Sequence, residues 1–114
     1  MKKPPYVSHY LVLKDLIDGV DVRQYSDVVM YLTTRIENIK VDLVKNGIEF
    51  IEDITRVSKY STYKPYILYP SIENINKAKK LLELYKTDEV LKFLKLKQII
   101  SDESHREYWL YELQ

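Results

Sequence analysis

The groups that could carry out acid–base or metal chemistry are scattered along this chain. Its two histidines, His9 and His105, lie far apart, and neither has further ligands nearby at a metal-binding spacing. The acidic residues are dispersed among lysines, as on a solvated helix surface, and the adjacent pairs Glu52-Asp53 and Asp102-Glu103 would point apart. There is no cysteine, and two isolated glycines cannot form a phosphate-binding loop. We therefore expect no active site, no metal and no other cofactor.

One segment has a pattern that suits a different chemistry, the contact with phosphate groups. Residues 55–65 contain no acid and carry three cations interleaved with tyrosines, namely Arg56, Lys59, Tyr60, Tyr63 and Lys64. This pattern favours contact with nucleic acid, whereas the lysines of residues 77–80 are better explained as the wet face of an amphipathic helix. The formal net charge is only +1. An argument for nucleic-acid binding therefore depends on where the charges are placed.

The composition is that of an ordinary globular protein. With 114 residues, 46% of them hydrophobic and 31% charged, the chain has the size of one domain, or of one domain with an appendage. The absence of cysteine gives no reason to expect an oxidising compartment. No apolar segment follows the charged N-terminus as in a signal peptide, and no run of about 18 apolar residues could span a bilayer. We expect a cytoplasmic protein without a membrane partner.

Apolar residues at helical spacing predict three helices in the first part of the chain. The first helix has Ser8 as its N-cap, Gly19 as its stop and an apolar face of Tyr10, Leu13, Leu16 and Ile17. The second begins at Ser26 or Asp27, with an apolar face of Val28, Val29 and Leu32. The third follows a Thr33-Thr34 turn and ends at Asn46-Gly47, with an apolar face of Ile36, Ile39, Leu43 and Val44.

After Gly47 the pattern changes to that of strands. Residues 48–52 roughly alternate and residues 66–69 are aromatic and β-branched, so they predict a β-hairpin with the polar segment 55–65 as a long loop, or wing. The helical period returns after Ser71, a natural N-cap, with an apolar face of Ile72, Ile75, Ala78, Leu82 and Tyr85. Thr87 or Asp88 is expected to cap a continuation through Val90, Leu91, Leu94 and Ile99, as a second or a kinked helix.

The C-terminal helical segment has more apolar residues than one helix face can bury. We expect the surplus within residues 71–100 to pack against a second copy in a homodimer, with Leu91 and Leu94 near the contact, or against a different protein. The tail 108–113 is aromatic and apolar, and its pattern fits either a helix or a strand.

The order of these elements resembles the winged helix-turn-helix family, in particular its small single-domain members from bacteria, phages and mobile elements. The resemblance covers residues 8–70 and depends on the helix-pair core, the Asn46-Gly47-Ile48 turn and the 50–69 hairpin; the core residues are Val28, Val29, Leu32, Ile36, Ile39 and Leu43. It implies an α+β fold, with a winged helix-turn-helix domain in residues 1–70 and a helical extension in residues 71–114. One departure is that Thr33 or Thr34 replaces the usual turn glycine, so we expect no left-handed residue in this turn.

The resemblance also implies a DNA-binding site. The third helix would enter the major groove and the wing would contact the DNA backbone, which assigns to the site Thr33, Thr34, Arg35, Asn38, Lys40, Lys45, Arg56, Lys59, Tyr63 and Lys64. Arg35 and Asn38 would contact base edges, since arginine pairs with guanine and asparagine with adenine. Glu37 and Asp42 on the same helix would repel phosphate. An ordinary solvated helix face accounts for these helix residues about as well.

Two functions of different classes follow from these expectations. The first is a DNA-binding transcriptional regulator, or an accessory recombination or replication factor, that acts as a homodimer on double-stranded DNA. The second is a protein-interaction module, such as a phage or mobile-element inhibitor of a host protein, that uses the fold without DNA. The wing favours the first function, and the low net charge favours the second.

Overall fold

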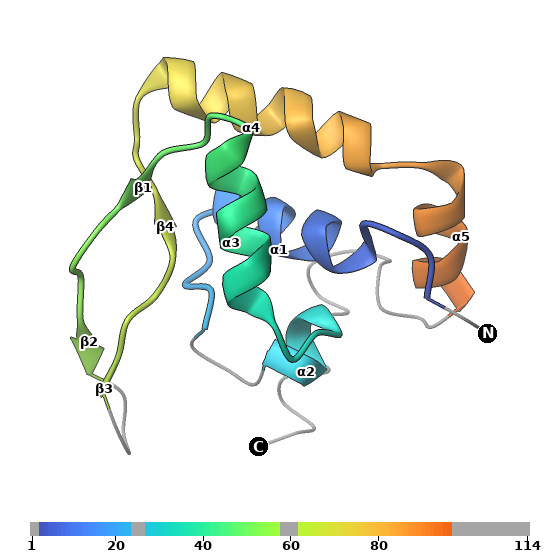
Figure 1. Ribbon diagram of the computed structural model, residues 1–114, viewed down its shortest axis with the longest axis horizontal. Helices are drawn as coiled ribbons and strands as arrows, with labels where there is room; N and C mark the ends of the chain where they lie inside the picture. The colour runs from blue at the N-terminus through green and yellow to red at the C-terminus, as the bar shows by residue number, and fades with distance from the viewer. Residues whose placement is uncertain (1–2, 24–26, 58–61, 97–114) are drawn as a thin grey trace.

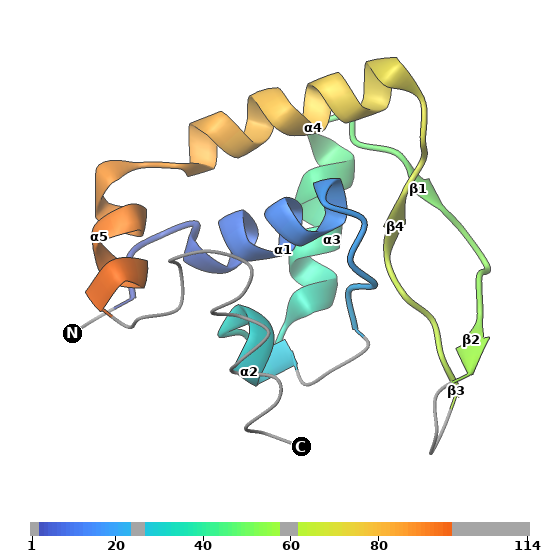
Figure 2. The ribbon, with the colours of Figure 1, turned by 180° about the vertical axis from the view of Figure 1, so that it is seen from behind.

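The computed structural model describes residues 3–23, 27–57 and 62–96 (Figure 1). The described chain is α+β, with a helical body and a two-stranded antiparallel ribbon at one side (Figures 1 and 2). Its elements in order are α1 (Val7–Ile17), α2 (Asp27–Tyr31), α3 (Ile36–Lys45), β1 (Phe50–Ile51), β2 (Arg56–Val57), β3 (Thr62–Tyr63), β4 (Ile67–Leu68), α4 (Ile72–Tyr85) and α5 (Asp88–Leu96). None of its helices is long and apolar enough to cross a membrane.

The first helix forms as predicted, but it begins differently. Tyr6 precedes α1 in a left-handed conformation (φ 70°), and its side chain makes no capping hydrogen bond. Ser8 is therefore not the N-cap: it lies inside the helix, is buried, and donates a hydrogen bond to the carbonyl of Leu32 at 3.3 Å. Gly19 follows the end of α1 with φ 80°, which confirms it as a stop, since glycine adopts this conformation without a Cβ clash.

The predicted helix pair is present as α2 and α3, joined by a tight turn at residues 32–35. The expectation that this turn lacks a left-handed residue is wrong, because Leu32 adopts φ 58°. Thr33 closes the turn, since its Oγ1 accepts a hydrogen bond from the backbone N–H of Arg35 at 3.1 Å. A leucine in this conformation carries a steric cost on the order of 1 kcal/mol. Hydrogen bonds from Lys3 Nζ and Ser8 Oγ to the Leu32 carbonyl help to hold the residue in this conformation.

Two apolar faces of this pair differ from the prediction. In α2 the buried residues are Met30 and Tyr31, while Val28 is exposed. In α3, Ile36, Ile39 and Leu43 are buried as predicted, but Val44 is half exposed. α2 is too short for the spacing of its apolar residues to define one buried face. Its orientation is therefore determined by the core against which it packs.

The structure confirms that strands follow Gly47, which has φ 85°. β1 pairs with β4 at the base, with Phe50 opposite Leu68, and β2 pairs with β3 nearer the tip. An isolated bridge between Val22 and Tyr66 attaches the base of the hairpin to the α1–α2 connection. The hairpin therefore projects from the helical body while its base is anchored to it (Figure 1).

The C-terminal part forms two helices, as one of the two predicted alternatives. Ser71 caps α4, since its Oγ accepts from the N–H of Asn74 at 3.0 Å, and Thr87 caps α5 by accepting from the N–H of Val90 at 3.2 Å. Ile72 is 81% exposed and so does not belong to the buried face of α4. Ala78 and Tyr85 are buried and Ile75 and Leu82 partly buried, as predicted, and the buried face also includes Asn74 and Leu81. Ile99 and the tail 101–114 lie outside the described residues.

One hydrophobic core unites both parts of the chain. α4 packs along α1, and the core cluster contains residues from both sides of Pro70, including Leu11, Leu43, Leu81 and Leu94. Leu94 has no exposed surface, and Leu91 is partly buried against the same core. The expected place of Leu94 at a dimer contact is therefore corrected: the side chain fills the protein's own core. The predicted boundary after Pro70 separates two segments that are packed together.

Asn74 is a buried polar residue that the periodicity did not reveal. Its Nδ2 donates to the carbonyls of Glu49 (2.8 Å) and Tyr69 (2.9 Å), and its Oδ1 accepts from the N–H of Glu49 (2.8 Å). These backbone groups lie at the two ends of the hairpin. One side chain on α4 thus fixes the base of the hairpin to the helical body.

Candidate nucleic-acid interface

The solvent-facing side of α3 carries most of the site residues expected on this helix. Asn38 and Lys45 are exposed on α3, whereas Thr34 and Arg35 are exposed just before it, with Arg35 as the N-cap of the helix. Arg35 and Lys45 have no ion-pair partner among the described residues. The described part of the structure therefore exposes one cation without an ion-pair partner at each end of α3, with the amide of Asn38 between them.

The two acids of α3 are both paired with residues from other elements. Glu37 Oε1 lies 3.2 Å from a guanidinium nitrogen of Arg23, in the α1–α2 connection. Asp42 Oδ2 lies 2.9 Å from Nε2 of His9 on α1. The repulsion of phosphate that the sequence predicts from these acids is consequently reduced at Glu37, and at Asp42 it depends on the charge of the imidazole.

Lys40 differs from the other expected site residues of α3. Its Nζ lies 3.3 Å from Glu52 and also sits over the rings of Phe50 and Tyr66, at 5.2 and 4.9 Å from their centroids. The side chain therefore packs α3 against the hairpin and is not free to contact phosphate. Thr33 is similarly engaged, since its hydroxyl closes the α2–α3 turn.

The wing cations are partly neutralised by an acid that lies far away in the sequence. Arg56 Nε lies 2.7 Å from Asp21 Oδ2, and the Tyr63 hydroxyl donates to the same oxygen at 3.2 Å. The premise that no acid offsets the wing is therefore wrong for Arg56. Lys64 is exposed and has no ion-pair partner among the described residues, whereas Lys59 lies outside them. These pairings bring the wing and the α1–α2 connection together.

Burial also changes the pKa of a tyrosine at the base of the hairpin. It raises the pKa of Tyr66, with a smaller opposing effect from Arg23, which donates to the Tyr66 hydroxyl at 3.3 Å. The phenol therefore stays neutral near pH 7, and the charges around it include those of Arg23, Glu37, Asp27 and the Lys40–Glu52 pair.

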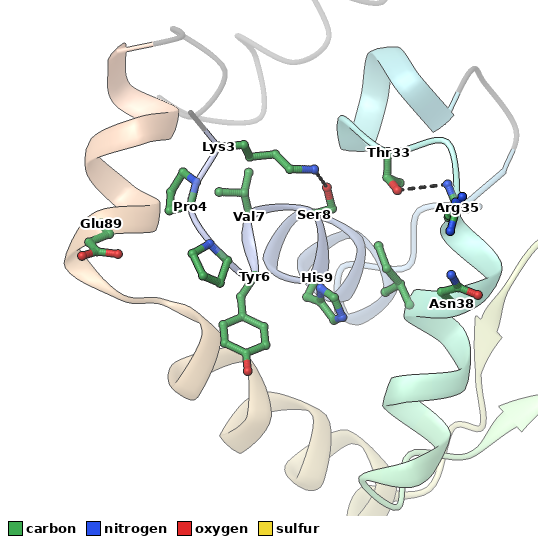
Figure 3. A pocket seen from close by; sticks show the side chains of 12 residues that line it. Lys3, Pro4, Tyr6, Val7, Ser8, His9, Thr33, Arg35, Asn38 and Glu89 are labelled. Carbon is green, nitrogen blue, oxygen red and sulfur yellow. Dashed lines mark hydrogen bonds between the residues drawn. The ribbon is translucent and has the colours of Figure 1, made fainter. Parts of the chain in front are cut away.

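A groove of about 640 Å³ runs beside the exposed face of α3 (Figure 3). Arg35 and Asn38 line one side of it, and the N-terminal arm with Tyr6 lines the other. The arm is fixed by Lys3, whose Nζ donates to the Leu32 carbonyl at 2.8 Å and to Ser8 Oγ at 3.0 Å. Sequence reasoning did not assign the arm to the site, because no local pattern places it beside α3.

No group of three or more acidic or histidine side chains within the described ranges is placed to hold a metal ion. His9 is instead engaged with Asp42 and the neighbouring rings, and His105 lies outside those ranges. Comparison of the chain with protein-family models, with curated proteins and with solved structures found no match. The assignment of a function therefore depends on the geometry of this surface.

Proposed function

We propose that the protein is a winged helix-turn-helix DNA-binding protein, a regulator or an accessory recombination or replication factor, with α3 as its recognition helix. The observation that carries this proposal is the outer face of α3, where Arg35, Asn38 and Lys45 are exposed and both acids of the helix are held by other residues. An α-helix fits the major groove, and arginine and asparagine are the side chains suited to guanine and adenine edges.

The hairpin supports the same proposal through its position. It projects beside α3, and Lys64 near its tip adds an exposed cation to those of the helix (Figure 2). The clamp formed by Asn74 and the contacts of Lys40 fix the angle between wing and helix. A fixed angle allows both elements to contact one duplex without an ordering cost at the moment of binding.

Fluorescence anisotropy with a labelled random-sequence duplex, titrated at several salt concentrations, tests the proposal. Binding should weaken as salt rises, because phosphate contacts release counterions. Arg35→Ala and Lys45→Ala should each lower the salt slope by about one. Lys79→Ala removes the same charge from α4 and serves as the matched control, with the slope unchanged. A duplex that shows no salt-dependent binding at low salt refutes the proposal.

Selection of binding sequences from a random pool tests base recognition separately. Asn38→Ala should relax the preference at one base position, with a loss on the order of 1–3 kcal/mol at that position. A motif identical to that of the unmodified protein would exclude Asn38 from base contact.

A protein-interaction module is a second candidate, favoured by one specific observation. Val41 and Val44 are 50% and 52% exposed on the same outer face of α3. Two apolar side chains on a face of mixed charge also suit a protein partner. A photo-crosslinking amino acid at position 41 separates the candidates in cells. Nuclease should digest the crosslinked partner if it is DNA, whereas the partner should resist nuclease and be digested by protease if it is a protein.

A further inference from the structure

His9 and Asp42 form a contact between α1 and the recognition helix that involves a titratable group. Nε2 of His9 lies 2.9 Å from Oδ2 of Asp42. The His9 side chain is 21% exposed and the Asp42 side chain 49% exposed, so the pair lies at the edge of the α3 surface and not in the core. Asp42 is one helical turn from Asn38 and three residues from Lys45, both of which belong to the proposed DNA-binding face.

The neighbours of His9 hold its ring in this position. The rings of Tyr6 and Tyr85 approach it edge-on, with centroids at 5.5 and 5.4 Å, and stack on each other at 5.1 Å. Burial raises the pKa of Tyr85, and Asp42 raises it further, so Tyr85 stays neutral in the physiological range. The imidazole is therefore held by packing against the edge of this tyrosine pair.

Few other charged groups face this pair. Lys45 lines the groove of about 430 Å³ between α3 and α4 that contains both His9 and Asp42. Lys3, Arg35 and Glu89 line the larger groove on the other side of His9. Lysine, arginine and exposed carboxylates keep their charges between about pH 5 and pH 8, whereas histidine ordinarily changes its charge in that interval. Among these described neighbours, His9 is the one side chain of the type that ordinarily does so.

We infer that protonation of His9 strengthens the binding of the α3 face to DNA, so that the proposed DNA-binding site responds to pH. This inference rests on the proposed function. When His9 is neutral, the pair carries the full negative charge of Asp42 on a helix that approaches phosphates. When His9 is protonated, the pair is neutral and the repulsion disappears. DNA affinity should therefore increase as the pH falls through the titration of this histidine.

The size of the effect follows from the placement of Asp42. A unit charge at roughly 8 Å from a phosphate, in a medium between protein and water, changes the affinity about three- to tenfold. The change should be smaller at high salt, because Asp42 is half exposed and mobile ions screen it. We therefore expect DNA to bind about three- to tenfold more tightly at about pH 5.5 than at about pH 7.5 in low salt.

The duplex titration at these two pH values, with three variants of the full chain, tests the inference. Asp42→Asn removes the charge of the acid, so it should bind at the higher pH about as tightly as the unmodified protein binds at the lower pH, and it keeps a pH response because His9 still gains a proton. His9→Gln should bind at both pH values with the affinity that the unmodified protein has at the higher pH. His105→Gln removes the other histidine and is the matched control, with the pH response retained. Circular dichroism at both pH values verifies that each variant is folded.

The outcomes distinguish this inference from the function on which it rests. If DNA binds but the folded His9→Gln variant keeps the pH response, or the folded Asp42→Asn variant binds no more tightly than the unmodified protein at the higher pH, the inference is overturned and the proposed function stands. A response that is lost in His105→Gln and kept in His9→Gln also overturns it. If the duplex does not bind at either pH, both the inference and the DNA-binding proposal fail.

Discussion

Replacement of Asn74 by alanine should loosen the hairpin from the helical body. Asn74 is only 3% exposed, and its amide makes three hydrogen bonds of 2.8–2.9 Å to Glu49 and Tyr69 backbone groups. Each buried group left without a partner costs about 1–3 kcal/mol. Tyr69 and Glu49 lie near the surface, so water would satisfy part of this loss. We expect Asn74→Ala to lower the free energy of unfolding by about 2–4 kcal/mol.

Urea unfolding followed by circular dichroism measures this loss, with Asn76→Ala as the matched control. Asn76 lies on the same helix but is exposed, so its replacement should change stability by less than about 0.5 kcal/mol. Hydrogen exchange gives a local test, because the amide of Glu49 loses its acceptor in Asn74→Ala alone. Equal stabilities of the two variants, with unchanged exchange at Glu49, would refute the role of Asn74 as a clamp.

Three further predictions follow from the packing. Leu94→Ala should cost about 2–5 kcal/mol in urea unfolding without changing the mass measured by light scattering, since Leu94 fills the protein's own core; a changed mass with unaltered stability would contradict this. Tyr31→Phe should cost about 2 kcal/mol, because the buried hydroxyl donates to Asp15 Oδ2 at 3.0 Å; a loss below about 0.5 kcal/mol would contradict it. Burial raises the pKa of Asp27 in the folded protein above its ordinary 3.8. The protonated carboxyl therefore stabilises the fold below pH 3.8, and this stabilisation is lost as the pH rises through the raised pKa. Asp27→Asn should therefore be more stable than the unmodified protein near neutral pH, and this gain should shrink in acid.

Local patterns of the sequence were sufficient for the helices and for the strands at the base of the hairpin, but not for β2 and β3, which lie in the segment predicted as a loop. The three- and four-residue spacing of Ile36, Ile39 and Leu43 correctly predicted the buried face of α3. Ser71 was correctly identified as a cap, and Thr87 is one of the two caps proposed for α5, because a cap bonds to the backbone only three residues away. The α+β class also followed from these patterns, whereas the winged-helix assignment is a proposal that depends on how the elements pack.

The charge of the candidate site was not predictable from neighbouring residues. The segment around Arg56 contains no acid, yet Asp21 pairs with it across the fold. In the same way Arg23 and His9 approach Glu37 and Asp42 from separate elements. Electrostatic interactions depend on distance in space, so the number of free cations on a surface can be counted only after distant segments have been brought together.

The sequence by itself determined the order of the helices and several of their ends, because these depend on hydrogen bonds and steric preferences over a few residues. Only the tertiary structure decided which side chains became buried or paired. Asn74 faces inward since the hairpin offers it three backbone partners, and Leu94 fills the core that it shares with α1. Leu32 takes a left-handed conformation that no local preference favours. In each case the interactions with distant residues outweigh a local tendency of about 1 kcal/mol or less.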